Sequence, residues 1–157
     1  MRIGHGYDVH ALGSGNHIVV GGVEIEFHKG IIAHSDGDVL IHAVCDALLG
    51  GLAQGDIGQH FPDSEPRWEN ADSREFLRAV VAMVIEEGLE IAHADVTIVA
   101  QEPRMAMHIP LMRERMTEDM RIDTSQLNIK ATTTEGLGFV GRGEGIEAHA
   151  VVILREG

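Results

Sequence analysis

The sequence predicts an α+β fold with a βαβ unit in its second half. Segments rich in valine, isoleucine and threonine, which favour strands, alternate with segments whose apolar residues recur at helical spacing. In the second half, one helical segment lies between two strand segments, which is the order of a βαβ unit. With 157 residues, 44% of them hydrophobic, we expect residues 1–157 to form a single domain around one core.

Three short strands are predicted at the start of the chain, over residues 2–10, 17–20 and 23–27. The pair Gly21-Gly22 separates the last two, and such a dipeptide is typical of a hairpin turn.

A helix is predicted over residues 38–52, because its apolar residues recur at helical spacing. On another face of this helix Asp38, His42 and Asp46 lie four residues apart, so one histidine stands between two acids. A second helix begins at Asp72, where Glu75 completes the pattern of a capping box, and ends at Gly88.

Residues 55–71, between these helices, form a long connection, and connections of this length are usually functional or disordered. In the second half, residues 96–100 and 127–132 are predicted strands around a third helix that begins near Pro110. Alternating apolar residues predict a final strand over residues 146–154.

Composition excludes several functions. The net charge of −13, with no basic run, disfavours nucleic acid as a partner. No apolar run is long enough to span a bilayer, and the first residues lack a secretory signal, so we expect a soluble cytoplasmic protein without a membrane partner. The one cysteine, Cys45, excludes an intrachain disulfide and is expected to be buried and unreactive. An anionic substrate would need metal ions, backbone N–H groups or basic residues such as Lys130 and Arg142.

The segment Asp8-Val9-His10 indicates a metal site. Residues two apart on a strand point to the same side, so Asp8 and His10 can act together. With His42 as a third ligand, one tetrahedral position stays free, which is the arrangement of catalytic zinc. An Asp-x-His segment also arises by chance in a chain with ten histidines, so the pattern alone leaves a non-metal role open.

Two polar clusters surround the predicted helix over residues 38–52. Residues 33–38 fit a helix cap made by Ser35 or Asp36, or an anion site in which His34 and Ser35 hold a phosphate. In residues 55–63, Asp56 and Asp63 fit either ordinary turns or carboxylates that bind the hydroxyls of a sugar or polyol.

Residues 130–136 end a predicted strand in three threonines and Glu135. Threonine is a common strand former, whereas Glu135 beside hydroxyls and a glycine suits magnesium or manganese held jointly with phosphate oxygens. Residues 138–145 are rich in glycine but lack the P-loop pattern, which disfavours nucleotide triphosphate hydrolysis.

Five segments together resemble the 2-C-methyl-D-erythritol 2,4-cyclodiphosphate synthases of the non-mevalonate isoprenoid pathway. They are residues 2–10 (RIGHGYDVH), 33–38 (AHSDGD), 55–58 (GDIG), 131–135 (ATTTE) and 141–145 (GRGEG). The resemblance runs over the whole chain and implies a mixed sheet with helices on one face, assembled as a homotrimer around a threefold axis with active sites at the subunit junctions. It implies a cyclase in which the 2-phosphate of a cytidine-diphosphate methylerythritol attacks the β-phosphate and expels CMP.

The resemblance also implies roles for individual residues. Zinc, or another divalent transition metal, would be held by Asp8, His10 and His42, and a magnesium or manganese ion by Glu135 together with substrate phosphates. His34 and Thr133 would stabilise the transition state. The substrate would be bound by Asp8, His10, His34, Ser35, Asp56, Ile57, Gly58, Phe61, Asp63, Ala100, Pro103, Arg104, Met105, Ala131, Thr132, Thr133, Glu135, Phe139 and Arg142. Some members of the family carry lysine where this chain has Arg104 and Gly136; Arg104 retains a cation that can contact the diphosphate.

Two other functions fit parts of the sequence. A zinc-dependent phosphohydrolase would use the same open metal position to activate water, but no further histidine or carboxylate is clearly dedicated to deprotonating that water. A trimeric binding protein for isoprenoid diphosphates would line a central cavity with Phe139, Arg142 and Glu144. This second role would add to catalysis rather than replace it, because it leaves the three metal ligands without a task.

Overall fold

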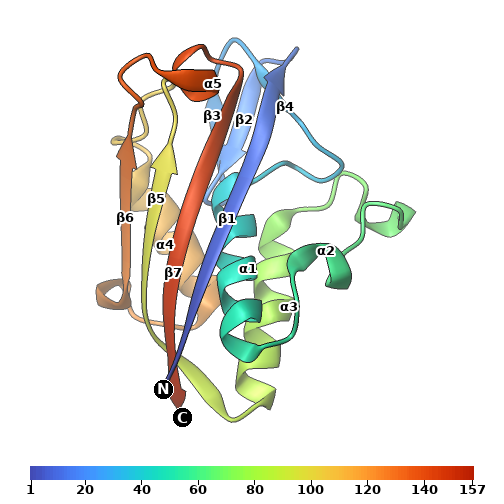
Figure 1. Cartoon of the computed structure of the whole chain (residues 1–157), viewed down its shortest axis with the longest axis vertical. Helices are drawn as coiled ribbons and strands as arrows, with labels where there is room; N and C mark the ends of the chain where they lie inside the picture. The colour runs from blue at the N-terminus through green and yellow to red at the C-terminus, as the bar shows by residue number, and fades with distance from the viewer.

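The computed structural model describes all residues, 1–157. A five-stranded mixed sheet forms the front of the molecule in Figure 1. The strand order is β4-β1-β7-β5-β6; β5 and β6 run parallel, and the other neighbours run antiparallel. The strands are β1 (Arg2–Gly13), β4 (Gly30–Ile32), β5 (Leu89–Val99), β6 (Leu127–Thr132) and β7 (Gly145–Glu156). A separate hairpin contains β2 (His17–Val20) and β3 (Val23–Glu26).

Three long helices cover one face of this sheet: α1 (Val39–Leu52), α3 (Ser73–Glu86) and α4 (Ile109–Met120). Shorter elements are α2 (Ile57–His60), α5 (Gly138–Gly141) and the 3₁₀ turns η1 (Pro66–Trp68) and η2 (Thr124–Gln126). The order β5-α4-β6 confirms the predicted βαβ unit, and the mixed sheet with helices on one face is confirmed as well. None of these helices has the length and apolar content that crossing a bilayer requires.

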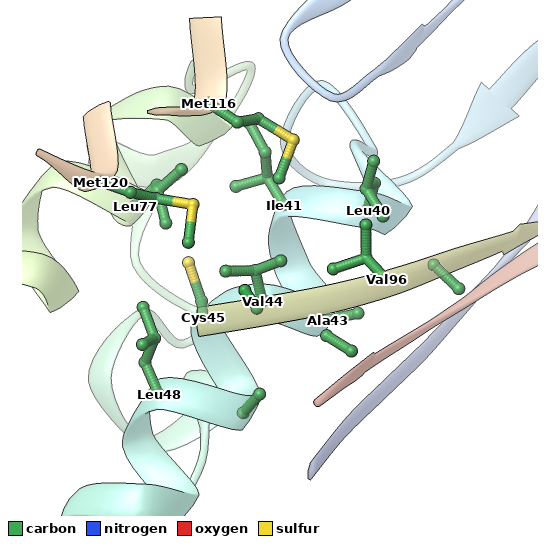
Figure 2. Close-up of a cluster of buried hydrophobic side chains, with 14 of the residues drawn as sticks. Leu40, Ile41, Ala43, Val44, Cys45, Leu48, Leu77, Val96, Met116 and Met120 are labelled. Carbon is green, nitrogen blue, oxygen red and sulfur yellow. The ribbon is translucent and has the colours of Figure 1, made fainter. Parts of the chain in front are cut away.

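The core lies between the sheet and the helices, and α1 is its centre. Almost every side chain of α1 is buried, because β1 and β7 lie on one side of the helix and α3 and α4 on the other. Figure 2 shows Cys45 of α1 beside the side chain of Met120 from α4, and Met116 of the same helix near Ile41. Cys45 is buried, as predicted, and burial raises the pKa of its thiol, which favours the unreactive protonated form.

Two glycines allow α1 to approach β1 closely. A Cβ atom on Gly4 would overlap the carbonyl group of Ala47, and one on Gly6 would overlap that of Ala43. Larger residues would push the helix away from the strand. The glycines therefore set the distance between β1, which carries Asp8 and His10, and α1, which carries His42.

The carboxylate of Asp38 connects the hairpin to the start of α1. It accepts hydrogen bonds from the backbone N–H groups of Gly21, Gly22 and Ile41 at 2.9, 2.7 and 3.0 Å. Both glycines have positive φ, as the predicted hairpin turn requires. The cap of α1 is thus Asp38, and the prediction of a cap from Ser35 or Asp36 was wrong.

Several boundaries differ from the predictions. Strand β5 begins at Leu89 rather than at residue 96; its first half contains alanine, acids and a register irregularity near Ile91, so local propensity does not reveal it. Strand β4 and helix α5 were not predicted, and residues 55–71 contain α2 and η1. Asp72 caps α3 through the N–H of Arg74, without a reciprocal hydrogen bond from Glu75.

Candidate functional site

Asp8, His10 and His42 converge on one point, as their sequence pattern predicted. Asp8 Oδ2 lies 2.8 Å from His10 Nε2 and 3.2 Å from His42 Nδ1, and the two imidazole nitrogens are 3.2 Å apart. The first two residues come from β1 and the third from α1. One oxygen and two nitrogens, all within 4.8 Å of one another, form a set of donors that suits a divalent transition metal.

The electrostatics of the cluster favour an ionised aspartate. Burial alone would raise the pKa of Asp8, but hydrogen bonds from His10 and His42 outweigh it and lower that pKa to about 2. Burial would likewise lower the pKa of His42, whereas the hydrogen bond to Asp8 and the charges of Asp8, Asp38 and Asp36 raise it. The carboxylate is therefore ready to bind a cation over the whole physiological pH range.

Acidic residues near His42 do not flank its ring as the helical spacing indicated. Asp38 caps α1, and Asp46 Oδ1 accepts a hydrogen bond from the N–H of Ile57 at 3.0 Å. The second ring nitrogen, His42 Nε2, instead lies 2.8 Å from the hydroxyl of Ser73, which in turn donates to Asp36 Oδ1. Neither contact was predicted, because Ser73 directly follows the expected helix cap Asp72 and the sequence gives no sign that its side chain contacts His42.

The metal-ligand pocket, a cavity of about 290 Å³, opens beside the three ligands. Predicted site residues that line it together with the ligands are His34, Ser35, Ile57, Gly58, Phe61 and Asp63. Asp56 does not line it; the side chain caps α2 by accepting from Gln59 N at 3.0 Å. Lining residues that were not predicted are Ile32, Ala33, Trp68 and Phe76.

An aromatic cluster forms one wall of the metal-ligand pocket. The rings of Phe61 and Phe76 stack with centroids 4.6 Å apart, and Trp68 meets them edge-on at 5.2 and 5.3 Å. Such packing fixes the wall without filling the pocket. Only the aromatic character of Trp68 and Phe76 could have suggested this role, and buried aromatic residues are far more often simple core.

A second cavity, the β6-end pocket of about 680 Å³, lies at the end of β6. Seven predicted residues line it, namely Ala100, Pro103, Arg104, Met105, Ala131, Thr132 and Thr133. The two pockets share no residue and lie at opposite edges of the sheet, one beside β4 and the other beside β6 (Figure 1). One chain therefore does not bring His34 and Thr133 into the same cavity.

Glu135, Phe139 and Arg142 lie outside both pockets, in the segment after β6. Glu135 is exposed, in a left-handed turn with φ of 56°. Arg142 Nε donates to Glu144 Oε2 at 2.6 Å, and the Phe139 side chain nearby is half-exposed. Lys130, which we expected to neutralise an anion, pairs with Asp95 on the sheet surface at 2.5 Å.

Comparisons with known proteins give consistent results. A family model described as "YgbB family" matches residues 1–155. The 2-C-methyl-D-erythritol 2,4-cyclodiphosphate synthase of Cellvibrio japonicus is 60% identical over 154 residues, which cover 98% of this chain and 97% of the relative. The synthase of Geobacter sulfurreducens is 57% identical and covers 99% of both chains.

Solved structures are similar in fold as well. The bifunctional IspDF of Campylobacter jejuni has a TM-score of 0.95 and 38% identity, over 99% of this chain and 42% of that one. The CDP complex of IspF from Plasmodium falciparum has a TM-score of 0.87 and 31% identity, over 99% of this chain and 96% of that one.

Proposed function

This chain belongs to the YgbB family, and we propose that its metal-ligand pocket and its β6-end pocket form one active site between neighbouring copies. Its activity is that of a 2-C-methyl-D-erythritol 2,4-cyclodiphosphate synthase, a lyase of the non-mevalonate pathway. It converts 4-diphosphocytidyl-2-C-methyl-D-erythritol 2-phosphate into the 2,4-cyclodiphosphate and CMP. The observation that carries this conclusion is the cluster of Asp8, His10 and His42 at a pocket, in a chain of this family.

The donor set supports zinc as the resident metal. One carboxylate and two imidazoles around an open pocket are typical of catalytic zinc, and Glu135 supplies the single hard carboxylate that suits magnesium or manganese bound through phosphates. When bound, such cations supply electrostatic stabilisation of charge on phosphate oxygens. The nucleophile is itself an anionic phosphate, so the protein needs to position groups more than to move protons.

Residues of the metal-ligand pocket then take the methylerythritol phosphate end of the substrate. His34 and Ser35 lie beside the ligands, where they can donate hydrogen bonds to a phosphate, and Asp63 can accept hydrogen bonds from hydroxyl groups. Asp56 is close in sequence but does not line the pocket, so binding of a ribose hydroxyl by Asp56 would need the cavity to extend to the start of α2.

The β6-end pocket takes the cytidine end. Residues 100–105 and Thr132 are among the residues that line it, and backbone groups of this segment can recognise a base. Arg104 keeps a cation where some members of the family carry lysine, and Thr133 also lines the pocket, where its hydroxyl can hold a phosphate oxygen. The CDP complex of the Plasmodium falciparum relative supports a cytidine diphosphate as part of the ligand.

A homotrimer would unite the two pockets. The sheet face opposite the helices exposes a row of apolar residues on β1 and β7, with 72% of Ile3, 42% of Val9 and 40% of Val151 accessible in the single chain. Exposed apolar side chains of this kind favour burial against other copies. Packing three sheets around an axis would cover it and place the β6 edge of one copy near the β4 edge of the next.

The same assembly would create a central cavity near α5. Three copies of Arg142, each paired with Glu144, would converge at one end of it, and Phe139 would contribute an apolar wall. Such a cavity suits an isoprenoid diphosphate, whose tail is apolar and whose head is anionic.

Phosphorus NMR of the substrate incubated with the protein and both metals tests the function. We expect the resonances of a cyclic diphosphate together with those of CMP. A hydrolase acting through the same metal would instead release a linear phosphate product, and that result would overturn the cyclase mechanism.

A further inference from the structure

The ring of His42 makes contacts on both of its nitrogen atoms, and those contacts differ in kind. Its Nδ1 faces Asp8 and His10, whereas its Nε2 faces away from them, toward the hydroxyl of Ser73 at 2.8 Å. His42 is 9% exposed and Ser73 fully buried, so bulk water does not compete for these contacts. Ser73 is the first residue of α3, which Figure 1 shows beside α1.

The direction of each hydrogen bond follows from what the groups can donate. A carboxylate only accepts, so the short contact between Ser73 and Asp36 Oδ1 uses the single proton of the Ser73 hydroxyl. The hydroxyl oxygen is then left as an acceptor, and the group facing it at 2.8 Å must donate. His42 must therefore carry its proton on Nε2.

A metal binds an imidazole nitrogen through its lone pair, and only an unprotonated nitrogen offers one. With a proton held on Nε2 by Ser73, Nδ1 is the nitrogen left to bind a metal where Asp8 and His10 converge, although in the metal-free cluster it donates to Asp8 Oδ2. We propose that Asp36 and Ser73 form a hydrogen-bond relay that fixes the tautomer and orientation of His42 and so sets the metal affinity of this chain. The inference rests on the metal site of the proposed function, and Ser73 and Asp36 act in it as positioning residues.

The relay also connects the metal site to the loop that carries His34 and Ser35. Asp36 accepts from the N–H of Ser73 at 3.0 Å and from the N–H of Asp38 at 3.1 Å. The backbone of the same loop bonds to residues 70 and 71, through Asn70 N to His34 O and Asp36 N to Ala71 O. The Asp36 carboxylate thus binds the backbone of the loop that carries His34 and Ser35 and, through Ser73, positions His42.

Zinc affinity, measured by competition with a chromogenic chelator, tests the relay. Loss of such an outer partner typically weakens metal binding about 10–100-fold, and we expect this for Ser73→Ala. Ser73→Thr, which retains the hydroxyl, should restore most of the affinity. Because Ser73 acts through the metal, excess zinc should also return the turnover of Ser73→Ala toward that of the unaltered protein.

Asp72→Ala is the matched control, since it removes the neighbouring cap of the same helix without touching His42. We expect a lower melting temperature and unchanged zinc affinity. Equal zinc affinity of Ser73→Ala and the unaltered protein would overturn the relay. His42→Ala separates this outcome from failure of the metal site itself: if that variant also binds zinc normally, the ligand assignment is wrong, and if it loses zinc, only the relay is wrong.

Nitrogen-15 NMR of the unaltered, zinc-loaded protein provides a readout that does not depend on how a variant folds. We expect a slowly exchanging proton on His42 Nε2 and a nitrogen shift at Nδ1 that changes when zinc is removed. A proton on Nδ1 with zinc at Nε2 would contradict the relay directly.

Discussion

Gly6 of β1 lies against Ala43 of α1 so closely that a Cβ atom on the glycine would overlap the alanine's carbonyl oxygen. The contact fixes the position of the helix relative to the strand, so that His42, the residue before Ala43, reaches Asp8 and His10. The geometry of Asp8, His10 and His42 therefore depends on the close backbone contact between Gly6 and Ala43 as well as on the three side chains themselves.

Gly6→Ala should therefore weaken both the fold and the site. Relieving the overlap requires a backbone shift, which typically costs about 1–3 kcal/mol, and the shift should move His42 away from Asp8 and lower zinc affinity. Gly50→Ala is the control, because a Cβ there meets nothing closer than His5 O at 3.9 Å, and removing a helical glycine should stabilise the protein by about 0.5–1 kcal/mol. Urea unfolding and zinc titration of both variants check this. Equal stability of the two variants would show that the close contact between β1 and α1 is unimportant.

The buried cap Asp38 should give the stability a pH dependence of its own. Burial, reinforced by Asp36, raises the pKa of Asp38 from 3.8 to about 6, although three backbone N–H groups act to lower it. Since the folded-state pKa exceeds the unfolded one, the folded protein holds this proton more tightly. The contribution of the protonated Asp38 carboxyl to the free energy of unfolding is therefore fully present below about pH 4 and is lost as the pH rises through about 6.

Asp38→Asn keeps the shape of the cap and removes the titration. As the pH rises from 4 to 7, the free energy of unfolding of the unaltered protein should fall relative to that of the variant, by up to about 3 kcal/mol. Urea unfolding at a series of pH values, on metal-free protein, measures the difference. A difference that does not change with pH would mean that Asp38 stays ionised in the folded state, held so by its three N–H partners.

Glu135→Gln should weaken binding of the second cation, magnesium, and leave zinc bound. Glu135 is exposed and lies outside the metal-ligand pocket, so zinc content should be unchanged. Magnesium bound through one carboxylate and substrate phosphates loses its only protein charge in this variant, so the magnesium concentration needed for half-maximal release of CMP should rise. Superimposable magnesium titrations of the two proteins would refute the assignment.

Arg142→Met should abolish binding of an isoprenoid diphosphate near α5. We expect geranyl diphosphate to raise the melting temperature of the unaltered protein, because a ligand that binds only the folded state stabilises it. The variant should lose this shift while still binding zinc. If saturating geranyl diphosphate leaves the melting temperature of the unaltered protein unchanged, the central cavity does not take this ligand.

The sequence predicted those parts of the molecule that depend on local pattern. Helix α1, strand β6 and the hairpin at Gly21-Gly22 have clear periodicity or turn chemistry, and Asp8 and His10 share a strand face. The first half of β5 was missed because long-range pairing with β7, and not its own composition, makes it a strand.

The contacts behind the site could not be predicted for a related reason. Ser73 follows the predicted helix cap Asp72 and carries no pattern of its own, and only the packing of α3 on α1 brings its hydroxyl to His42. Asp38 and Asp46 share the helical face of His42 in sequence, yet each finds backbone N–H partners outside the helix. Helical spacing places side chains on one face but does not determine their partners.

Subunit complementation tests most directly whether the two pockets form one active site between copies. His42→Ala damages the metal-ligand pocket, and Thr133→Ala damages the β6-end pocket, so each variant alone should be nearly inactive. In randomly mixed trimers of equal amounts, about a quarter of the junctions would combine two intact pockets, so turnover should return to about a quarter of that of the unaltered protein. Mixed trimers that form, as mass spectrometry can show, and yet remain as inactive as their parents would contradict a site shared between subunits.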